Sequence, residues 1–139
     1  MKNFMKISLD TNIWIFAFEA HNPWCETIVR SLDKFDTVIP EQVRVEVERN
    51  LSFRTKKDFY RTLRHFGVPV DFAEVPQHRI ERLYSLGLKK GDAVIGAFCE
   101  WKKVDVFVSD NRDFLKGLSP GYDFKVMSPE EFCKMYLWD

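Results

Sequence analysis

The stretch SLDTNIWIFAF, residues 8–18, sets a single aspartate, Asp10, between two apolar runs. Residues 4–9 form a short apolar run of strand length. Residues 11–20 are apolar on nearly every side, which indicates a buried helix capped by Asp10 or Thr11. A buried carboxylate costs several kcal/mol unless a cation or hydrogen bonds compensate for it. We therefore expect Asp10 to meet a partner where the strand ends and the helix begins.

Strand-like and helix-like segments alternate along the rest of the chain. Strands are predicted at residues 4–9, 37–40, 105–110 and 123–127, and residues 68–75 are extended but only moderately strand-like. Helices are predicted at residues 11–20, 23–33, 40–51, 55–67, 76–86, 91–104 and 111–118, and from 128 onward. This alternation is typical of an α/β domain with a mainly parallel sheet. With 139 residues and no repeat or linker, the chain is predicted to form one domain over residues 1–139.

The composition narrows the functional classes. Lys and Arg number 21, as do Asp and Glu, so the net charge of zero gives no overall attraction to nucleic acid or membrane. The cysteines Cys25, Cys99 and Cys133 form no CxxC pair or disulfide pattern, which favours a reducing compartment. Lys6 and Asp10 interrupt the N-terminal apolar residues, and no apolar run reaches transmembrane length. We expect a cytoplasmic protein with no membrane partner.

Acidic residues recur at the ends of the predicted elements. Asp10 ends the first strand, and Asp110 ends the strand at 105–110. Asp113 lies in the first turn of the helix that follows, and Asp92 opens the helix at 91–104. Because ligands of open α/β sheets bind outside the carboxyl ends of the strands, we expect these acids to lie near one another.

A helical wheel of residues 40–51 adds a further acid, Glu46. The inward stripe of this helix is apolar: Val43, Val47 and Leu51. The opposite face is charged and is expected to be solvated and mutually paired: Glu41, Arg44 and Glu48. Glu46 falls at the edge of the inward stripe. The wheel favours Glu46 over Glu48 without deciding between them, because Val45 fits it poorly.

Each acid alone has an ordinary structural explanation. An N-cap accounts for Asp10 or Asp92, a turn for Asp110, and the helix dipole for Asp113. Together they are harder to explain, because carboxylates about 4 Å apart repel by roughly 4 kcal/mol per pair at an effective dielectric constant of 20. Folding would not gather them without a cation. An all-oxygen site without His or Cys suits Mg²⁺ or Mn²⁺.

Four segments of the sequence resemble, in this order, the motifs of PIN-domain proteins: LDTN (9–12), VEVERNL (45–51), GDAVIGAF (91–98) and VSDNRDF (108–114). The resemblance covers residues 7 to about 132. PIN-domain proteins are metal-dependent ribonucleases, and many are VapC-like toxins of prokaryotic toxin–antitoxin pairs. The resemblance implies a three-layer fold, a central, mainly parallel sheet flanked by helices. It also implies Mg²⁺ or Mn²⁺ as cofactor, RNA as substrate, and a cognate antitoxin and a second copy of the chain as partners.

The resemblance also implies roles for individual residues. Its catalytic acids match four positions: Asp10, Glu46, Asp92 and Asp113. The candidate metal ligands are these four together with Asp110, and the supporting polar residues are Asn12, Ser109 and Asn111. The last motif departs from the family, because Ser109 replaces the common Thr and Asp110 is an additional acid. Either Asp110 or Asp113 is therefore nearer the metal, and we favour Asp113.

A basic stretch over residues 44–64 is the candidate RNA-binding surface. It interleaves cations with aromatic residues: Arg44, Arg49, Arg54, Lys56, Lys57, Arg61 and Arg64 with Phe53, Phe59 and Tyr60. Such a stretch can follow a phosphate backbone. A solvated helix face with aromatic rings docked in the core explains it equally well. The RNA-binding candidates are Lys56, Lys57 and Arg61, together with Lys89 and Lys90 beside the acid at position 92.

The sequence thus predicts a Mg²⁺- or Mn²⁺-dependent endoribonuclease that hydrolyses RNA phosphodiester bonds, as the toxin of a toxin–antitoxin pair. The alternative is a catalytically degenerate fold of the same kind that binds RNA or a protein without cutting. The full set of acids argues against that alternative. A receiver-type phosphoacceptor ranks third, because LDTN has one acid rather than a pair and VSDNRDF has no Lys.

Overall fold

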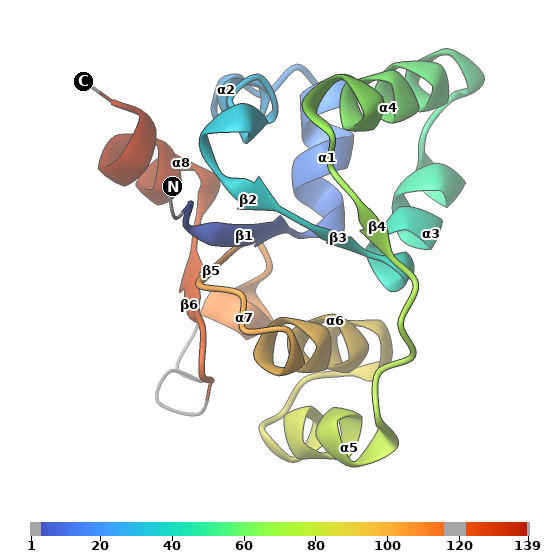
Figure 1. Ribbon diagram of the computed structural model, residues 1–139, viewed down its shortest axis with the longest axis vertical. Helices are drawn as coiled ribbons and strands as arrows, with labels where there is room; N and C mark the ends of the chain where they lie inside the picture. Colours follow the sequence, from blue (N-terminus) through green and yellow to red (C-terminus); the bar gives the residue numbers. More distant parts are fainter. Residues whose placement is uncertain (1–3, 116–121, 139) are drawn as a thin grey trace.

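A four-stranded sheet in the order β2-β1-β5-β6 forms the centre of the computed structural model, which describes residues 4–115 and 122–138 (Figure 1). Its strands are β1 (Lys6–Leu9), β2 (Asp36–Thr37), β5 (Val106–Val108) and β6 (Lys125–Met127). All three pairings are parallel. A second parallel pair joins β3 (Ile39–Pro40) to β4 (Val70–Asp71). The predicted mainly parallel sheet is confirmed.

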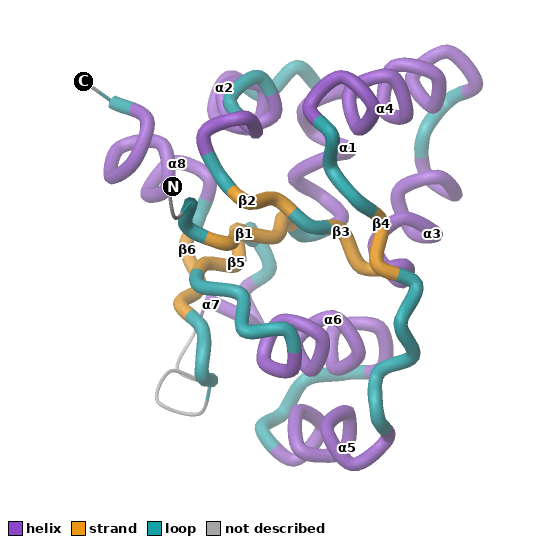
Figure 2. Tube along the Cα trace, viewed as in Figure 1, coloured by secondary structure: helices purple, strands orange, loops and turns teal. Residues whose placement is uncertain are grey.

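Helices cover both faces of the sheet. On one side lie α1 (Thr11–Phe18), α2 (Pro23–Val29) and α4 (Phe53–Phe66), and on the other lie α5 (Gln77–Ser85) and α6 (Lys90–Trp101). The remaining helical segments are α3 (Glu41–Asn50), α7 (Arg112–Leu115), α8 (Pro129–Phe132), the 3₁₀ turn η1 (Leu32–Lys34) and the π-turn η2 (Cys133–Leu137). Figure 2 shows the strands between the two groups of helices. The fold is the expected three-layer α/β architecture.

Register places the ends of two central strands together. Ile7 lies opposite Val106, and Leu9 lies opposite Val108. The backbone N–H of Asp10 then donates to the Val108 carbonyl over 2.8 Å, which extends the pairing by one step. Because the strands are parallel, both carboxyl ends face the same edge of the sheet.

The core explains how α1 and α4 pack together on one side of the sheet. Trp14 of α1 is fully buried, and its ring meets Phe59 of α4 edge to face at 5.3 Å. On the other side, Phe107 of β5 meets Phe114 of α7 at 4.9 Å. Buried aromatic pairs of this kind stabilise the fold by more than the burial of the two rings alone. The apolar surroundings of residues 8–18 are therefore core packing.

Local signals account for most element boundaries. Ser52 accepts a hydrogen bond from the Thr55 N–H, so α4 begins at Phe53, slightly before its predicted start at 55. Gly67 ends α4 in a left-handed conformation, at φ 63°. The predicted helix at 23–33 stops at Val29 and continues as η1. The predicted strand at 37–40 is divided between β2 and β3.

The predicted helix at 111–118 is seen only in its first part, as α7, because residues 116–118 lie outside the described residues. Over 4–115 and 122–138, no helix combines the length and the apolar character needed to cross a membrane.

Candidate functional site

Asp10 is the N-cap of α1 and is buried, with 5% of its surface exposed. Its Oδ1 accepts the backbone N–H of Thr11 over 2.8 Å. Its Oδ2 accepts the hydroxyl of Ser109 over 2.7 Å. Because Ser109 follows β5, this second bond ties the end of one central strand to the start of α1. Asp10 therefore acts as the predicted cap and is also held from a second strand.

Glu46 projects from α3 toward Asp10. Its Oε1 accepts the hydroxyl of Thr11 over 2.8 Å, and its Oε2 accepts the side-chain amide of Gln42 over 2.7 Å. Glu48 lies on the other side of α3, where it pairs with Arg44 over 2.8 Å. Of the two glutamates between which the helical wheel did not decide, Glu46 is therefore the one that faces the acids.

Asp92 comes from the first turn of α6, and Asn111 orients it. The Asn111 side-chain amide donates to Oδ2 of Asp92 over 2.8 Å, and its carbonyl oxygen accepts the backbone N–H of Asp113 over 2.9 Å. The backbone N–H of Asn111 in turn donates to the Ser109 hydroxyl over 3.0 Å. Two of the polar residues predicted as supporting, Ser109 and Asn111, thus link Asp10 to Asp92.

These acids line one cavity of about 520 Å³. Its predicted members are Asp10, Asn12, Glu46, Asp92 and Asn111. Other polar and apolar side chains complete the lining: Thr11, Ile15, Arg49 and Asn50. The cavity opens beyond the carboxyl ends of β1 and β5, as the parallel sheet predicts.

The two acids of the last motif, Asp110 and Asp113, stand outside the lining of this cavity. Asp113 is exposed in the first turn of α7. Asp110 is half-buried, and within the described residues no donor reaches its buried Oδ1. Both nevertheless act on the cavity through their charge, because Asp113 raises the pKa of Asp92 and Asp110 raises the pKa of Asp10.

The carboxylates raise one another's proton affinity. The pKa of Asp10 is raised to about 6, chiefly by burial; hydrogen bonds from Ser109 and Thr11 oppose the rise, and the charges of Asp92 and Asp110 add to it. Burial also raises the pKa of Asp92; the Asn111 hydrogen bond opposes this, and the charges of Glu46 and Asp113 add to it. Asp10 and Asp92 are therefore not favoured to be ionised together unless a positive charge lies near them.

The chemistry of the donors fits Mg²⁺ or Mn²⁺, which prefer carboxylate, amide and water oxygens. Coordination requires the carboxylates to move closer, since over residues 4–115 and 122–138 no three His, Cys, Asp or Glu side chains form a group that could hold a metal ion. Asp92 offers Oδ1, which no described residue engages as a hydrogen-bond donor, and Asp110 offers its unpartnered Oδ1. The donor atoms are therefore of the type that a divalent cation binds.

The RNA-binding candidates fall into two separate groups. Lys89 is the N-cap residue of α6 and Lys90 its first residue, and the charge of Lys89 lowers the pKa of Asp92. Lys56, Lys57 and Arg61 instead line a groove on α4. None of the five lines the acidic cavity.

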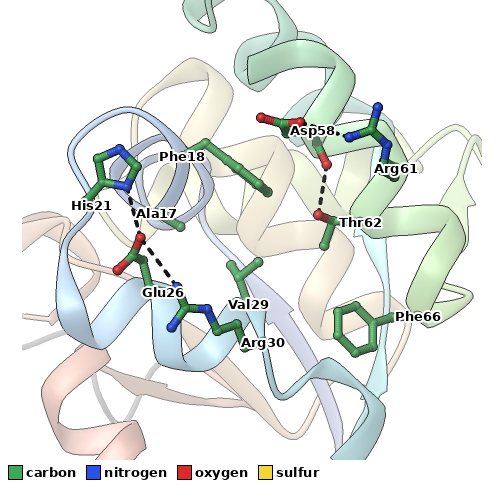
Figure 3. Close-up of a pocket in the computed structure, with 10 residues that line it drawn as sticks. All are labelled: Ala17, Phe18, His21, Glu26, Val29, Arg30, Asp58, Arg61, Thr62 and Phe66. Atoms are coloured by element: carbon green, nitrogen blue, oxygen red, sulfur yellow. Dashed lines mark hydrogen bonds and ion pairs between the residues drawn. The ribbon is translucent and has the colours of Figure 1, made fainter. Parts of the chain in front are cut away.

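A cavity of about 370 Å³ between α1, α2 and α4 has a different character (Figure 3). Its lining combines apolar side chains with ion pairs at the rim: Ala17, Phe18, Val29 and Phe66 with His21–Glu26 and Asp58–Arg61. None of the candidate acids reaches it. We therefore centre the candidate site on the acidic cavity.

Sequence reasoning missed several residues around the acids. Thr11 and Gln42 hold Glu46, but neither residue type signals a site by itself. Arg49 lines the cavity from α3 and was placed only in the general basic stretch. Its spacing from Glu46 carried the signal, because residues three apart share a helix face.

The fold and this cavity define a class of α/β proteins with carboxylates gathered at one edge of a parallel sheet. The chain belongs to the PIN domain family, because the family model described as PIN domain matches residues 7–117. No curated protein matches the sequence significantly.

Solved structures share the fold at low sequence identity. VapBC2 from Rickettsia felis, bound to a DNA fragment from its promoter, gives a TM-score of 0.61 at 17% identity, covering 89% of this chain and 98% of that chain. A toxin–antitoxin complex from Klebsiella pneumoniae gives 0.60 at 22% identity, covering 88% and 97%. PAE2754 from Pyrobaculum aerophilum gives 0.59 at 17% identity, covering 94% of each chain. These likenesses agree with the α/β architecture.

Proposed function

We propose that this protein is a Mg²⁺- or Mn²⁺-dependent endoribonuclease that hydrolyses RNA phosphodiester bonds. The observation that carries the proposal is the cavity shared by Asp10, Glu46 and Asp92, which come from three different elements of a PIN domain. Burial and mutual repulsion raise the pKa of two of these acids, and a divalent cation relieves such repulsion. A single domain over residues 1–139 would carry the activity.

The proposed metal ligands are Asp10 and Asp92, with Glu46 and Asp113 binding directly or through water and Asp110 as a further candidate. When bound, the metal supplies activation of a water molecule and stabilisation of negative charge on the phosphodiester. We favour Asp113 over Asp110 in the last motif, as the family pattern suggests.

The chain's own residues hold this site in a defined geometry. Ser109 and the Thr11 N–H fix both oxygens of Asp10, and the Thr11 hydroxyl fixes Glu46. Asn111 fixes Asp92. Hydrogen bonds to carboxylates orient them and lower their pKa, so they favour the charged form that a cation and an attacking water require.

Binding of RNA requires cations outside the acidic cavity. Lys89 and Lys90 begin α6 beside Asp92, where we propose that they contact a phosphate near the scissile bond. Lys56, Lys57 and Arg61 are proposed to contact RNA farther away. Asn12 lines the cavity and is proposed to support the ligand set.

The proposed biological role is that of a toxin in a toxin–antitoxin pair. Two similar solved structures are of toxin–antitoxin proteins, which supports a cognate antitoxin as partner. Dimerisation rests on family analogy alone. The three cysteines, Cys25, Cys99 and Cys133, are free and buried, and together with an RNA substrate they support action in the cytoplasm.

Cleavage of structured RNA by purified protein in Mn²⁺, with and without EDTA, tests the proposal. We expect cleavage only with metal, and a loss on the order of 100-fold or more in Asp10→Asn, the size seen when one group that stabilises transition-state charge is removed. Glu48→Gln is the control and should change little, because Glu48 faces away from the cavity. Metal-independent cleavage, or equal losses in both variants, would contradict the proposal. RNA binding without cleavage would favour the degenerate alternative.

A further inference from the structure

One face of α4 is built from cations and aromatic rings. Side chains spaced three and four residues apart line a groove of about 390 Å³: Phe53, Lys56, Lys57, Tyr60, Arg61 and Arg64. No acidic side chain lines this groove. Among its cations, Arg61 meets Asp58 over 3.3 Å at the exposed surface, which is a weak contact. The groove is therefore strongly positive on a chain whose net charge is zero.

The aromatic residues of α4 differ sharply in environment. Phe59 is fully buried against Trp14, so its ring belongs to the core. Phe53 is 76% exposed, and the Lys57 ammonium lies 4.7 Å from the centre of its ring. Core packing does not explain Phe53. An exposed ring beside ammonium groups is the arrangement that stacks a base while the cations hold the adjacent phosphates.

The α4 groove lies on the far side of α3 from the acids. Tyr60, which lines the groove, donates to Glu48 and accepts from Arg44. Glu46 faces the acidic cavity. Glu48 is two positions further along α3, so its side chain points about 200° around the helix from that of Glu46. The groove and the cavity share no lining residue. The groove is therefore distinct from the cutting site.

We propose that the α4 groove is a second nucleic-acid contact that holds a single-stranded segment of the substrate away from the cutting site. One base stacks on Phe53, and the neighbouring phosphates pair with the cations of the groove. That the strand is RNA rests on the proposed function, whereas the choice of a single strand follows from the exposed ring. An acidic protein segment would match the charges but would leave the Phe53 ring without a role.

Binding in EDTA tests the charges without cleavage. The probe is a fluorescein-labelled single-stranded RNA of about 16 nucleotides, followed by fluorescence anisotropy at several salt concentrations. The double variant Lys56→Gln/Lys57→Gln should raise Kd roughly tenfold. Since each phosphate contact on a single strand contributes about 0.7 to the salt slope, the slope should fall by about 1.4. The control Lys34→Gln/Lys125→Gln removes two exposed charges elsewhere and should leave both quantities unchanged.

A second set of variants tests the ring. Phe53→Leu should raise Kd by roughly fivefold or more and leave the salt slope unchanged, because stacking carries no charge. Phe53→Trp keeps a stacking surface and should retain binding. The control is Phe72→Leu, since Phe72 is also exposed, by 69%, but lies outside α4. Equal binding by Phe53→Leu and wild type would overturn the stacking role.

Two further measurements separate this proposal from the proposed function. In Mn²⁺, groove variants should raise KM for RNA of about 16 nucleotides and leave kcat unchanged, with no effect on RNA of about 4 nucleotides. Wild-type protein that binds RNA through the groove but never cuts it would contradict the proposed nuclease activity and leave the RNA-binding role of the groove standing.

An unchanged Kd in Lys56→Gln/Lys57→Gln would overturn the RNA-binding role of the groove. Polyglutamate that displaces the probe as well as unlabelled RNA would identify an acidic-peptide surface instead, which also overturns it.

Discussion

A β-carbon at position 91 would lie 2.7 Å from Oε2 of Glu46. Gly91, in the first turn of α6, therefore leaves the space in which the Glu46 carboxylate rests between α3 and α6. Real β-carbons do not approach an oxygen this closely without a shift. The absence of a side chain at Gly91 of α6 thus allows the position that the Glu46 carboxylate of α3 adopts.

Gly91→Ala should displace Glu46 and leave the fold intact. The carboxylate is the end of a flexible side chain, so it can rotate away, but it then leaves its partners Gln42 and Thr11. We expect cleavage to fall roughly tenfold or more, as for other changes that misorient a ligand. The free energy of unfolding should change by less than about 1 kcal/mol, since Ala favours a helix over Gly by about that amount.

A double-mutant cycle provides the control for this effect. In a Glu46→Ala background the clash is absent, so Gly91→Ala should stabilise the protein slightly and cause no further loss of cleavage. Unfolding in urea and initial cleavage rates measure the two quantities. Additive losses of activity would show that Gly91 acts independently of Glu46.

Ser109→Ala should move the pH dependence of the site upward. The Ser109 hydroxyl lowers the pKa of Asp10, so its removal raises that pKa further above its ordinary value. At neutral pH a smaller fraction of Asp10 is then ionised, and Mn²⁺ binding and cleavage should require a higher pH. Ser109→Thr keeps the hydroxyl and should behave like wild type. Profiles of cleavage against pH that coincide for all three proteins would rule out this role.

Asn111→Ala should weaken the site through Asp92. It removes the 2.8 Å hydrogen bond to Oδ2 and frees the carboxylate to rotate, for which a loss of roughly 10- to 100-fold in metal affinity is expected. Asn50→Ala is the matched control, since Asn50 also lines the cavity but donates only to the backbone carbonyl of Glu46. Calorimetric titration with Mn²⁺ measures both affinities. Equal effects would indicate a general change in polarity rather than orientation of Asp92.

The stability of the metal-free protein should fall as the pH rises through the titration of Asp10. The pKa of this group is raised from 3.8 to about 6, so the folded state prefers protonated Asp10. That preference contributes fully below the unfolded value and is lost as the pH passes the folded value. The difference between the pKa of 3.8 in the unfolded chain and about 6 in the folded protein corresponds to roughly 3 kcal/mol of unfolding free energy. In EDTA, Asp10→Asn should flatten this decline between about pH 4 and about pH 7 and melt above wild type at neutral pH. Identical pH profiles would exclude Asp10 as its source.

Mn²⁺ should restore stability to the wild type. An ion that binds only the folded state adds about 2.7 kcal/mol at a hundredfold excess over Kd. We expect a clear rise in Tm for wild type at neutral pH and a much smaller rise for Asp10→Asn. No shift in either protein would contradict the metal site.

The sheet and the direction of the acids could be predicted because they depend on local pattern. The apolar run before Asp10 and its capping position marked the end of β1, and the inward stripe of α3 favoured Glu46 over Glu48 without deciding between them. The surroundings of these acids could not be predicted. The contact between Gly91 and Glu46 depends on the packing of α3 against α6, which no local pattern encodes.

The basic stretch shows the same limit. Phe53 and Phe59 are both aromatic residues on one amphipathic helix, yet one is exposed and the other is core. Only the way α4 packs on α1 distinguishes them. The sequence likewise favoured Asp113 over Asp110 without deciding between them, because the turn after β5 determines where each carboxylate points.

The bond between Ser109 and Asp10 joins residues 99 positions apart. During synthesis, β1 leaves the ribosome long before β5, the strand that must lie beside it, has been translated. Pairing between such distant segments is slow to form, because a long loop must close first. The carboxylates thus stay apart on the growing chain, and we expect the proposed nuclease to be inactive until β5 has been translated and has paired with β1.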